Sequence, residues 1–179
     1  MKKKLYFVFA VLLFTSSAFV TLTTQSEYTV KEGFSIAFKS KDPSGDFKKV
    51  KGTIKFDEAD LGQSKFDITI DVNSISTGNA MQNKKAQTEE WFEASKYPQI
   101  KYISTKVEKA TDGYLITGNL TMKGVTKVKK FTAKVEKATS GPVFTGKFSV
   151  NRIEFGVGKK SDAVPDFMNI TFSVPTSKK

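Results

Sequence analysis

The sequence contains no cysteine and no histidine, and it has a single arginine, Arg152, and a single tryptophan, Trp91. Without cysteine, neither a disulfide framework nor a lipid-modified N-terminal cysteine can form. Without histidine, the commonest general base and the usual zinc and copper ligands are missing, and nucleophile systems that depend on histidine are excluded. The remaining carboxylates, lysines and tyrosines form no persuasive catalytic cluster. We therefore expect no enzyme, no cofactor and no metal site.

Long apolar runs are also scarce, and the only one lies at the N-terminus. Three lysines at residues 2–4 precede an apolar run at residues 5–14, and residues 16–18 (Ser-Ser-Ala) supply a small-residue cleavage site. This order is typical of a secretory signal peptide, because the run is shorter than the roughly 18–20 residues of a spanning helix. We expect cleavage near Ala18 and a periplasmic or secreted protein. An uncleaved N-terminal anchor is the alternative.

Acidic residues are outnumbered, and the formal net charge of +11 falls to +8 once the three leader lysines are removed. The lysines lie mostly on the polar side of the expected strands, which indicates a solvated surface. A basic surface also favours transient contact with anionic membranes or with phosphate-bearing ligands. We expect no nucleic-acid partner, because the lysines are spread evenly along an exported chain.

Apolar and polar residues alternate in many short segments, and residues 66–72 (FDITIDV) show the pattern most clearly. A period of two is the signal of a half-buried β-strand. Strands are predicted at residues 27–31, 34–40, 48–57, 64–73, 97–108, 113–122, 126–136, 143–153 and 167–174. The alternation shifts by one residue near Ser104, which predicts a β-bulge there.

Short turns rich in Asp, Gly and Pro separate most of these strands, as at residues 42–46, 112–113 and 140–142. Many short strands joined by such turns predict an antiparallel meander that closes as a sandwich or a barrel. A barrel of about eight strands is just wide enough to hold one small ligand. The sequence leaves open whether the interior is solid or hollow.

The segment from Ser76 to Lys96 interrupts the alternation. Residues 84–92 read as one or two short helical turns, and Thr88 is placed to cap the second of them. Trp91 and Phe92 lie side by side on this connection. They predict either a plug over one end of the barrel or packing against its outer wall.

Alternation alone does not tell a soluble barrel from a membrane barrel. A membrane barrel requires aromatic girdles and apolar outward residues over roughly 9–11 positions per strand. Here the polar side carries full charges, such as Lys55, Asp67, Asp71 and Lys134, and several strands are shorter. We therefore expect the apolar side to face inward.

An ordered series of motifs resembles the YceI-like lipid- or polyisoprenoid-binding family of exported bacterial proteins. The similar segments are residues 50–57, 64–78, 91–92, 96–100, 104–105, 118–127 and 151–158. Each motif is weak alone, but together they span most of residues 28–174 in order. The predicted division is a signal peptide at 1–18, a short segment at 19–27, a barrel domain at 28–174 and a frayed tail at 175–179.

The resemblance implies an all-β fold, an extended antiparallel eight-stranded lipocalin-like β-barrel with a short helical insertion. It also implies a non-catalytic protein whose lumen sequesters or carries a long-chain isoprenoid, an isoprenoid quinone or a fatty-acid-like lipid. The alternative is a stress-response or interaction module with a filled core and no lipid ligand. The sequence leaves open whether two barrels pair as a homodimer.

The candidate ligand-binding residues are the inward-facing apolar side chains of the predicted strands, with Trp91 and Phe92 at a mouth. For each wall residue, ordinary core packing is the alternative to ligand contact. Arg152 is a further candidate because its planar guanidinium suits a phosphate or carboxyl head group, and stacking on an aromatic ring or tying down the barrel end is the alternative. The wall candidates are Phe34, Ile36, Phe38, Ile54, Phe56, Phe66, Ile68, Ile70, Ile100, Tyr102, Ile116, Leu120, Phe148, Val150, Ile170 and Phe172.

Overall fold

The structure is a computed structural model that describes residues 26–161 and 163–179. The expected signal peptide at residues 1–18 lies outside the described residues, as does most of the segment at 19–27. The strands are β1 (Glu27–Val30), β2 (Ser35–Lys39), β3 (Ser44–Phe47), β4 (Val50–Lys55), β5 (Lys65–Asp71), β6 (Ile75–Ser76), β7 (Gln99–Ala110), β8 (Gly113–Met122), β9 (Val125–Glu136), β10 (Val143–Asn151) and β11 (Phe167–Lys178). Three short 3₁₀ helices, Leu61–Gln63, Val72–Ser74 and Arg152–Phe155, and one α-helix, α1 (Ala80–Gln87), lie between them.

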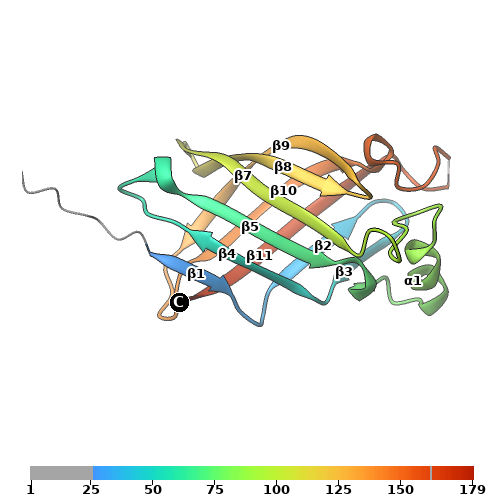
Figure 1. Ribbon diagram of the computed structural model, residues 1–179, viewed down its shortest axis with the longest axis horizontal. Coiled ribbons are helices and arrows are strands. Elements are labelled where there is room, and N and C mark those ends of the chain that lie inside the picture. Colours follow the sequence, from blue (N-terminus) through green and yellow to red (C-terminus); the bar gives the residue numbers. More distant parts are fainter. Residues whose placement is uncertain (1–25, 162) are drawn as a thin grey trace, which may run out of the picture.

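These strands form a closed antiparallel barrel of eight strands (Figure 1). β1 and β2 pair with successive parts of β11, so together they act as one bent strand. β3 with β4, and β5 with β6, continue each other in the same way. The barrel closes because β1 pairs with β4 on one side and with β11 on the other. The predicted all-β fold and eight-stranded barrel are confirmed.

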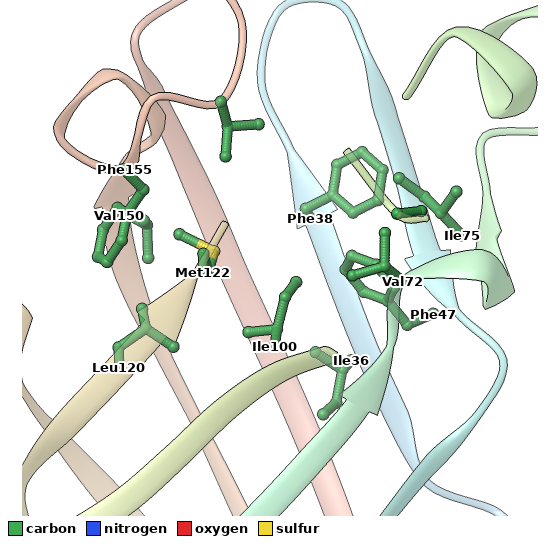
Figure 2. Close-up of a cluster of buried hydrophobic side chains, with 12 residues drawn as sticks. Ile36, Phe38, Phe47, Val72, Ile75, Ile100, Leu120, Met122, Val150 and Phe155 are labelled. Atoms are coloured by element: carbon green, nitrogen blue, oxygen red, sulfur yellow. The ribbon is translucent and has the colours of Figure 1, made fainter. Parts of the chain in front are cut away.

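Two buried clusters lie toward the two ends of the barrel interior. The first lies toward the end that α1 covers, and Figure 2 shows it gathering side chains from opposite walls, with Val150 and Leu120 on one side and Phe38 and Phe47 on the other. The second is built around Ile54, Phe66, Phe144 and Val174. Period-two alternation produces both clusters, because each strand turns every second side chain inward.

The strand predictions match the structure with three differences. β3 takes in Ser44–Asp46, which were predicted as part of a turn, and β6 was not predicted as a strand, because each is short and continues a neighbouring strand across a bend. The tail at residues 175–179 does not fray, so that expectation is wrong. β11 runs through Lys178 and pairs with β1, and the backbone carbonyl of Pro175 accepts a hydrogen bond from the Lys31 N–H at 3.1 Å.

The helical segment also differs from the prediction. α1 begins earlier than expected, after Asn79, whose side chain accepts hydrogen bonds from the N–H groups of Met81 and Gln82. Thr88 ends this helix and does not cap a second one, because its N–H and its hydroxyl both donate to the Lys85 carbonyl. Within the described ranges, the chain forms no helix with the length and apolar character needed to cross a bilayer.

The barrel wall has one irregular strand and one short ladder. The predicted bulge near Ser104 is confirmed, because Ser104 pairs with Gly118 while Lys106 pairs with Thr117. The β9–β10 ladder joins only Ala133–Glu136 with Val143–Gly146. Nearer the α1 end, side chains close this seam, and the ring of Phe131 stacks on Phe148 with centroids 4.8 Å apart.

Candidate functional site

The barrel encloses a cavity of about 420 Å³ whose lining is almost entirely apolar. Its walls come from every strand from β2 to β11. It extends from the α1 segment, where Gln82, Lys85 and Trp91 line it, toward Ile54 and Phe144 near the opposite end. A cavity of this size lies in the range of roughly 300–1,000 Å³ that is common for small-molecule sites.

Burial along single strands shows that the interior is hollow beside these walls. On β5, Phe66 is buried, whereas Ile68 and Ile70 on the same inward side are only half-buried. Ile170 and Phe172 on β11 also face inward and are also half-buried. In a filled core these side chains would have lost nearly all contact with solvent-sized space, because interiors pack at crystal-like density.

The predicted wall residues line this cavity, with two exceptions. Phe34 lies before β2 begins and is not among the lining residues. Phe56 is 5% exposed and packs into the aromatic cluster that closes the far end. Trp91, Phe92 and Arg152 also line the cavity, which places the insertion over an end of the barrel. That these residues contact a ligand stays a prediction.

The far end of the lumen is closed by four aromatic rings packed edge to face. Phe56 lies 5.0 Å from Tyr114 and 5.3 Å from Phe144, and Phe66 lies 5.0 Å from Phe144, measured between ring centroids. Such pairs are favourable because the positive edge of one ring meets the negative face of another. The cavity therefore has its mouth at the α1 end.

Sequence reasoning missed several lining residues. Phe47, Met122, Phe131, Phe144 and Met168 lie on the inward side of their strands, so the same alternation could have identified them. Asp42, Thr77, Gln82 and Lys85 bring polar groups to the mouth from turns and from α1. No period-two pattern marks such positions, because the fold alone brings them together.

Arg152 is 3% exposed, and backbone carbonyls surround its guanidinium. Its Nε donates to Pro165, Nη1 donates to Val157, and Nη2 donates to Lys159 and Val164, at 2.8–3.0 Å. Burial lowers the pKa of Arg152 from its usual value, and the carboxylate of Asp166 opposes this shift. The geometry thus gives Arg152 a structural task, holding together the loop between η3 (Arg152–Phe155) and β11.

Two cations lie near the ring of Trp91 at the mouth. The Arg152 guanidinium carbon is 5.3 Å from the indole centroid and the Lys85 ammonium is 5.9 Å from it, both within cation–π range. The indole Nε1 is buried and has no hydrogen-bond partner within residues 26–161 and 163–179. A buried donor without a partner costs roughly 1–3 kcal/mol.

A lysine in the turn between β8 and β9 connects the α1 segment, residues 76–96, to the barrel. Lys123 follows β8, and its ammonium donates to the backbone carbonyls of Glu89 at 2.7 Å and of Gly156 at 2.8 Å. The α1 segment, the β8–β9 turn and the loop after η3 therefore meet at one end. In the described part of the chain, Asp and Glu form no group of three or more that could hold a metal ion.

The comparisons with known proteins decide the family. The model of the YceI-like domain matches residues 19–175. The chain belongs to the YceI-like family. Protein YceI of Salmonella agona is 38% identical over 133 residues, which cover 71% of this chain and 69% of that protein. A UPF0312 protein of Pectobacterium atrosepticum is 43% identical over 86 residues, so the match spans less than half of that relative, 45% of its length.

Solved structures share the fold of this chain. BcnA of Burkholderia cenocepacia has a TM-score of 0.75 at 31% identity, covering 79% of this chain and 94% of that one. The polyisoprenoid binding domain from Saccharophagus degradans has a TM-score of 0.66, covering 85% and 98%. At 15% identity this domain supports the likeness of fold alone.

Proposed function

We propose that this protein is an exported, non-catalytic carrier that sheathes a long-chain isoprenoid or a related amphiphilic lipid inside its barrel. The observation that carries the proposal is the apolar cavity, which is closed by aromatic rings at one end and opens beside α1 at the other. This shape suits a molecule with a long apolar tail and one polar end.

The energetics favour a hydrocarbon tail. Burying apolar surface gains about 0.8 kcal/mol per methylene, so ten buried methylenes supply about 8 kcal/mol. Association costs roughly 4 kcal/mol or more in lost translational and rotational freedom. A tail of moderate length therefore leaves a net gain without specific polar contacts along the wall.

The lipid class and the location are parts of the same proposal. The Saccharophagus domain carries the description "polyisoprenoid binding" and shares the fold, so prenyl chains are the first ligands to test here. The lysine-led apolar N-terminus supports export to the periplasm or beyond. A hollow interior speaks against the alternative of an interaction module with a filled core.

The experiment is a titration of the purified mature protein with geranylgeraniol, in which calorimetry measures the binding. We expect saturable binding of one chain per barrel. Ile170→Phe adds volume at the cavity wall and should weaken binding about tenfold. Val128→Phe adds the same ring on the outer wall, where Val128 is 62% exposed, and serves as the matched control. Absence of binding by the wild-type protein, for geranylgeraniol and for fatty acids alike, contradicts the proposal.

A further inference from the structure

Two hydrogen-bond donors at the mouth of the lumen, the Trp91 N–H and the Lys85 ammonium, donate no hydrogen bond within the described part of the chain. Trp91 lines the cavity, and its buried N–H has no partner among the residues that the structure describes. Lys85 also lines the cavity, is exposed, and makes no ion pair with a carboxylate in residues 26–161 or 163–179. Asp42, Thr77 and Gln82 bring further polar side chains to the same end, and Thr77 is hydrogen-bonded to Asn83.

We propose that Trp91 and Lys85 form a head-group site for an anionic oxygen, a phosphate or a carboxylate, at the end of the bound tail. The proposal rests on the proposed function, because it assigns the polar end of the lipid carried in the same lumen. The indole N–H donates to one oxygen of the head group, and the Lys85 ammonium neutralises its charge.

The charges around the indole favour an anion over a neutral head group. Lys85 and Arg152 both lie within 6 Å of the Trp91 centroid. Asp166 lies 3.8 Å from Nη2 of Arg152 and offsets that cation. Among residues 26–161 and 163–179, no carboxylate is in ion-pair contact with Lys85, and Asp42, which also lines the mouth, makes no ion pair either. An anionic head group can therefore supply the contacting charge that Lys85 lacks.

Arg152 does not serve as the head-group cation in this assignment. Its Nε and both terminal nitrogens already donate to four backbone carbonyls, so turning it toward a ligand would leave buried acceptors unpaired. Lys85 is free of this constraint. Because its ammonium lies 5.9 Å from the indole centroid, Lys85 is close enough to contact a head group that accepts from the indole N–H.

The test compares two ligands with the same tail and different ends, geranylgeranyl phosphate and geranylgeraniol, by titration calorimetry. Trp91→Phe keeps an aromatic ring beside Arg152 and removes the N–H together with the five-membered ring of the indole. Lys85→Gln removes the positive charge of the one α1 lysine that lines the cavity. Lys84→Gln makes the same change at the preceding residue, which does not line the cavity, and is the matched control. Palmitate is a second anionic probe that separates a carboxylate from a phosphate.

We expect Trp91→Phe to weaken binding of geranylgeranyl phosphate by about tenfold or more, the typical worth of a hydrogen bond to a charged acceptor. Lys85→Gln should weaken it about fivefold at low salt and less at high salt, since the charge is near the surface. Geranylgeraniol affinity should change by less than threefold in both variants, and Lys84→Gln should change neither ligand. Whichever of the two anionic ligands, geranylgeranyl phosphate or palmitate, loses more affinity in these variants identifies the head group.

Three results can be told apart. If both ligands bind but the two variants weaken them equally, or weaken neither, the head-group site is wrong while the carrier proposal stands. If no probe binds the wild-type protein, the carrier proposal fails and the head-group site fails with it. Should Trp91→Phe fold poorly, Lys85→Gln on the exposed helix still decides the question.

Discussion

The guanidinium of Arg152 lies over the indole of Trp91, with 5.3 Å between the guanidinium carbon and the ring centroid. This contact joins the segment that covers the lumen to the loop after β10. Gly158 completes it, because a Cβ there would lie 2.8 Å from Nη1 of Arg152 and 3.0 Å from Cζ3 of Trp91. The mouth of the cavity is therefore built on one buried cation and one ring.

Replacing Arg152 should destabilise the fold without involving any ligand. Arg152→Met leaves four backbone carbonyls without their donors, and each buried unsatisfied group costs about 1–3 kcal/mol, so we expect a loss of about 3 kcal/mol or more in the free energy of unfolding. Urea denaturation measures it. Lys160→Met removes a positive charge from the same loop at an exposed position and should cost less than about 0.5 kcal/mol. Equal losses in the two variants would contradict this role.

The two ends of the lumen should respond differently to truncation. Phe144 is 2% exposed within the aromatic cluster, so Phe144→Ala should lower the free energy of unfolding by about 3–5 kcal/mol. Phe148 is only half-buried on the cavity wall, and Phe148→Ala should cost clearly less because part of its surface already faces open space. Thermal and urea unfolding of both variants test this difference, and a cost for Phe148→Ala as large as that for Phe144→Ala would indicate a filled interior.

Stability should fall at high pH because of Tyr102. Burial raises the pKa of Tyr102 above its usual value, since the phenolate is poorly solvated inside the barrel. The unfolded chain therefore releases this proton first, near pH 10, and the free energy of unfolding decreases as pH rises above that value. Urea denaturation between pH 9 and 11 should show a weaker decline for Tyr102→Phe than for the wild type. If the free energy of unfolding falls equally steeply with pH in both proteins, Tyr102 does not cause the decline.

Exposed apolar side chains beside the mouth predict contact with a membrane surface during lipid transfer. Met81 on α1 is 80% exposed and Phe167 at the start of β11 is 61% exposed. Met81→Asp should slow transfer of a bound lipid to anionic vesicles several-fold while leaving affinity in solution unchanged. Val128→Asp, on the outer wall, is the control. Transfer rates that are equal for both variants and the wild type would argue against docking through this end.

The strands could be predicted from the sequence because the alternation of side chains depends only on residues that are close together in the chain. Inward and outward side chains alternate, so Phe66, Ile68 and Ile70 could be assigned to one wall from the pattern alone. Whether that wall borders a cavity could not be predicted, because alternation is the same around a hollow or a filled core. Phe56 illustrates the limit, since it shares the inward side of its strand but packs into the closed end.

The mouth could be predicted only in part. The break in alternation indicated a covering segment with Trp91 and Phe92, but it did not indicate that Lys85 lies over the indole. The sequence left two roles open for Arg152. Its carbonyl partners belong to a loop that folds back through long-range contacts, so the structural role became apparent only from the geometry.

Native mass spectrometry of the mature protein, purified without detergent from its exported form, tests the central claim most directly. The account predicts a single bound lipid with a long apolar tail, retained in the gas phase and absent or reduced in Ile170→Phe. A protein that carries no lipid, and that takes up neither prenyl chains nor fatty acids when they are supplied, would contradict a lumen built to sheathe a hydrocarbon.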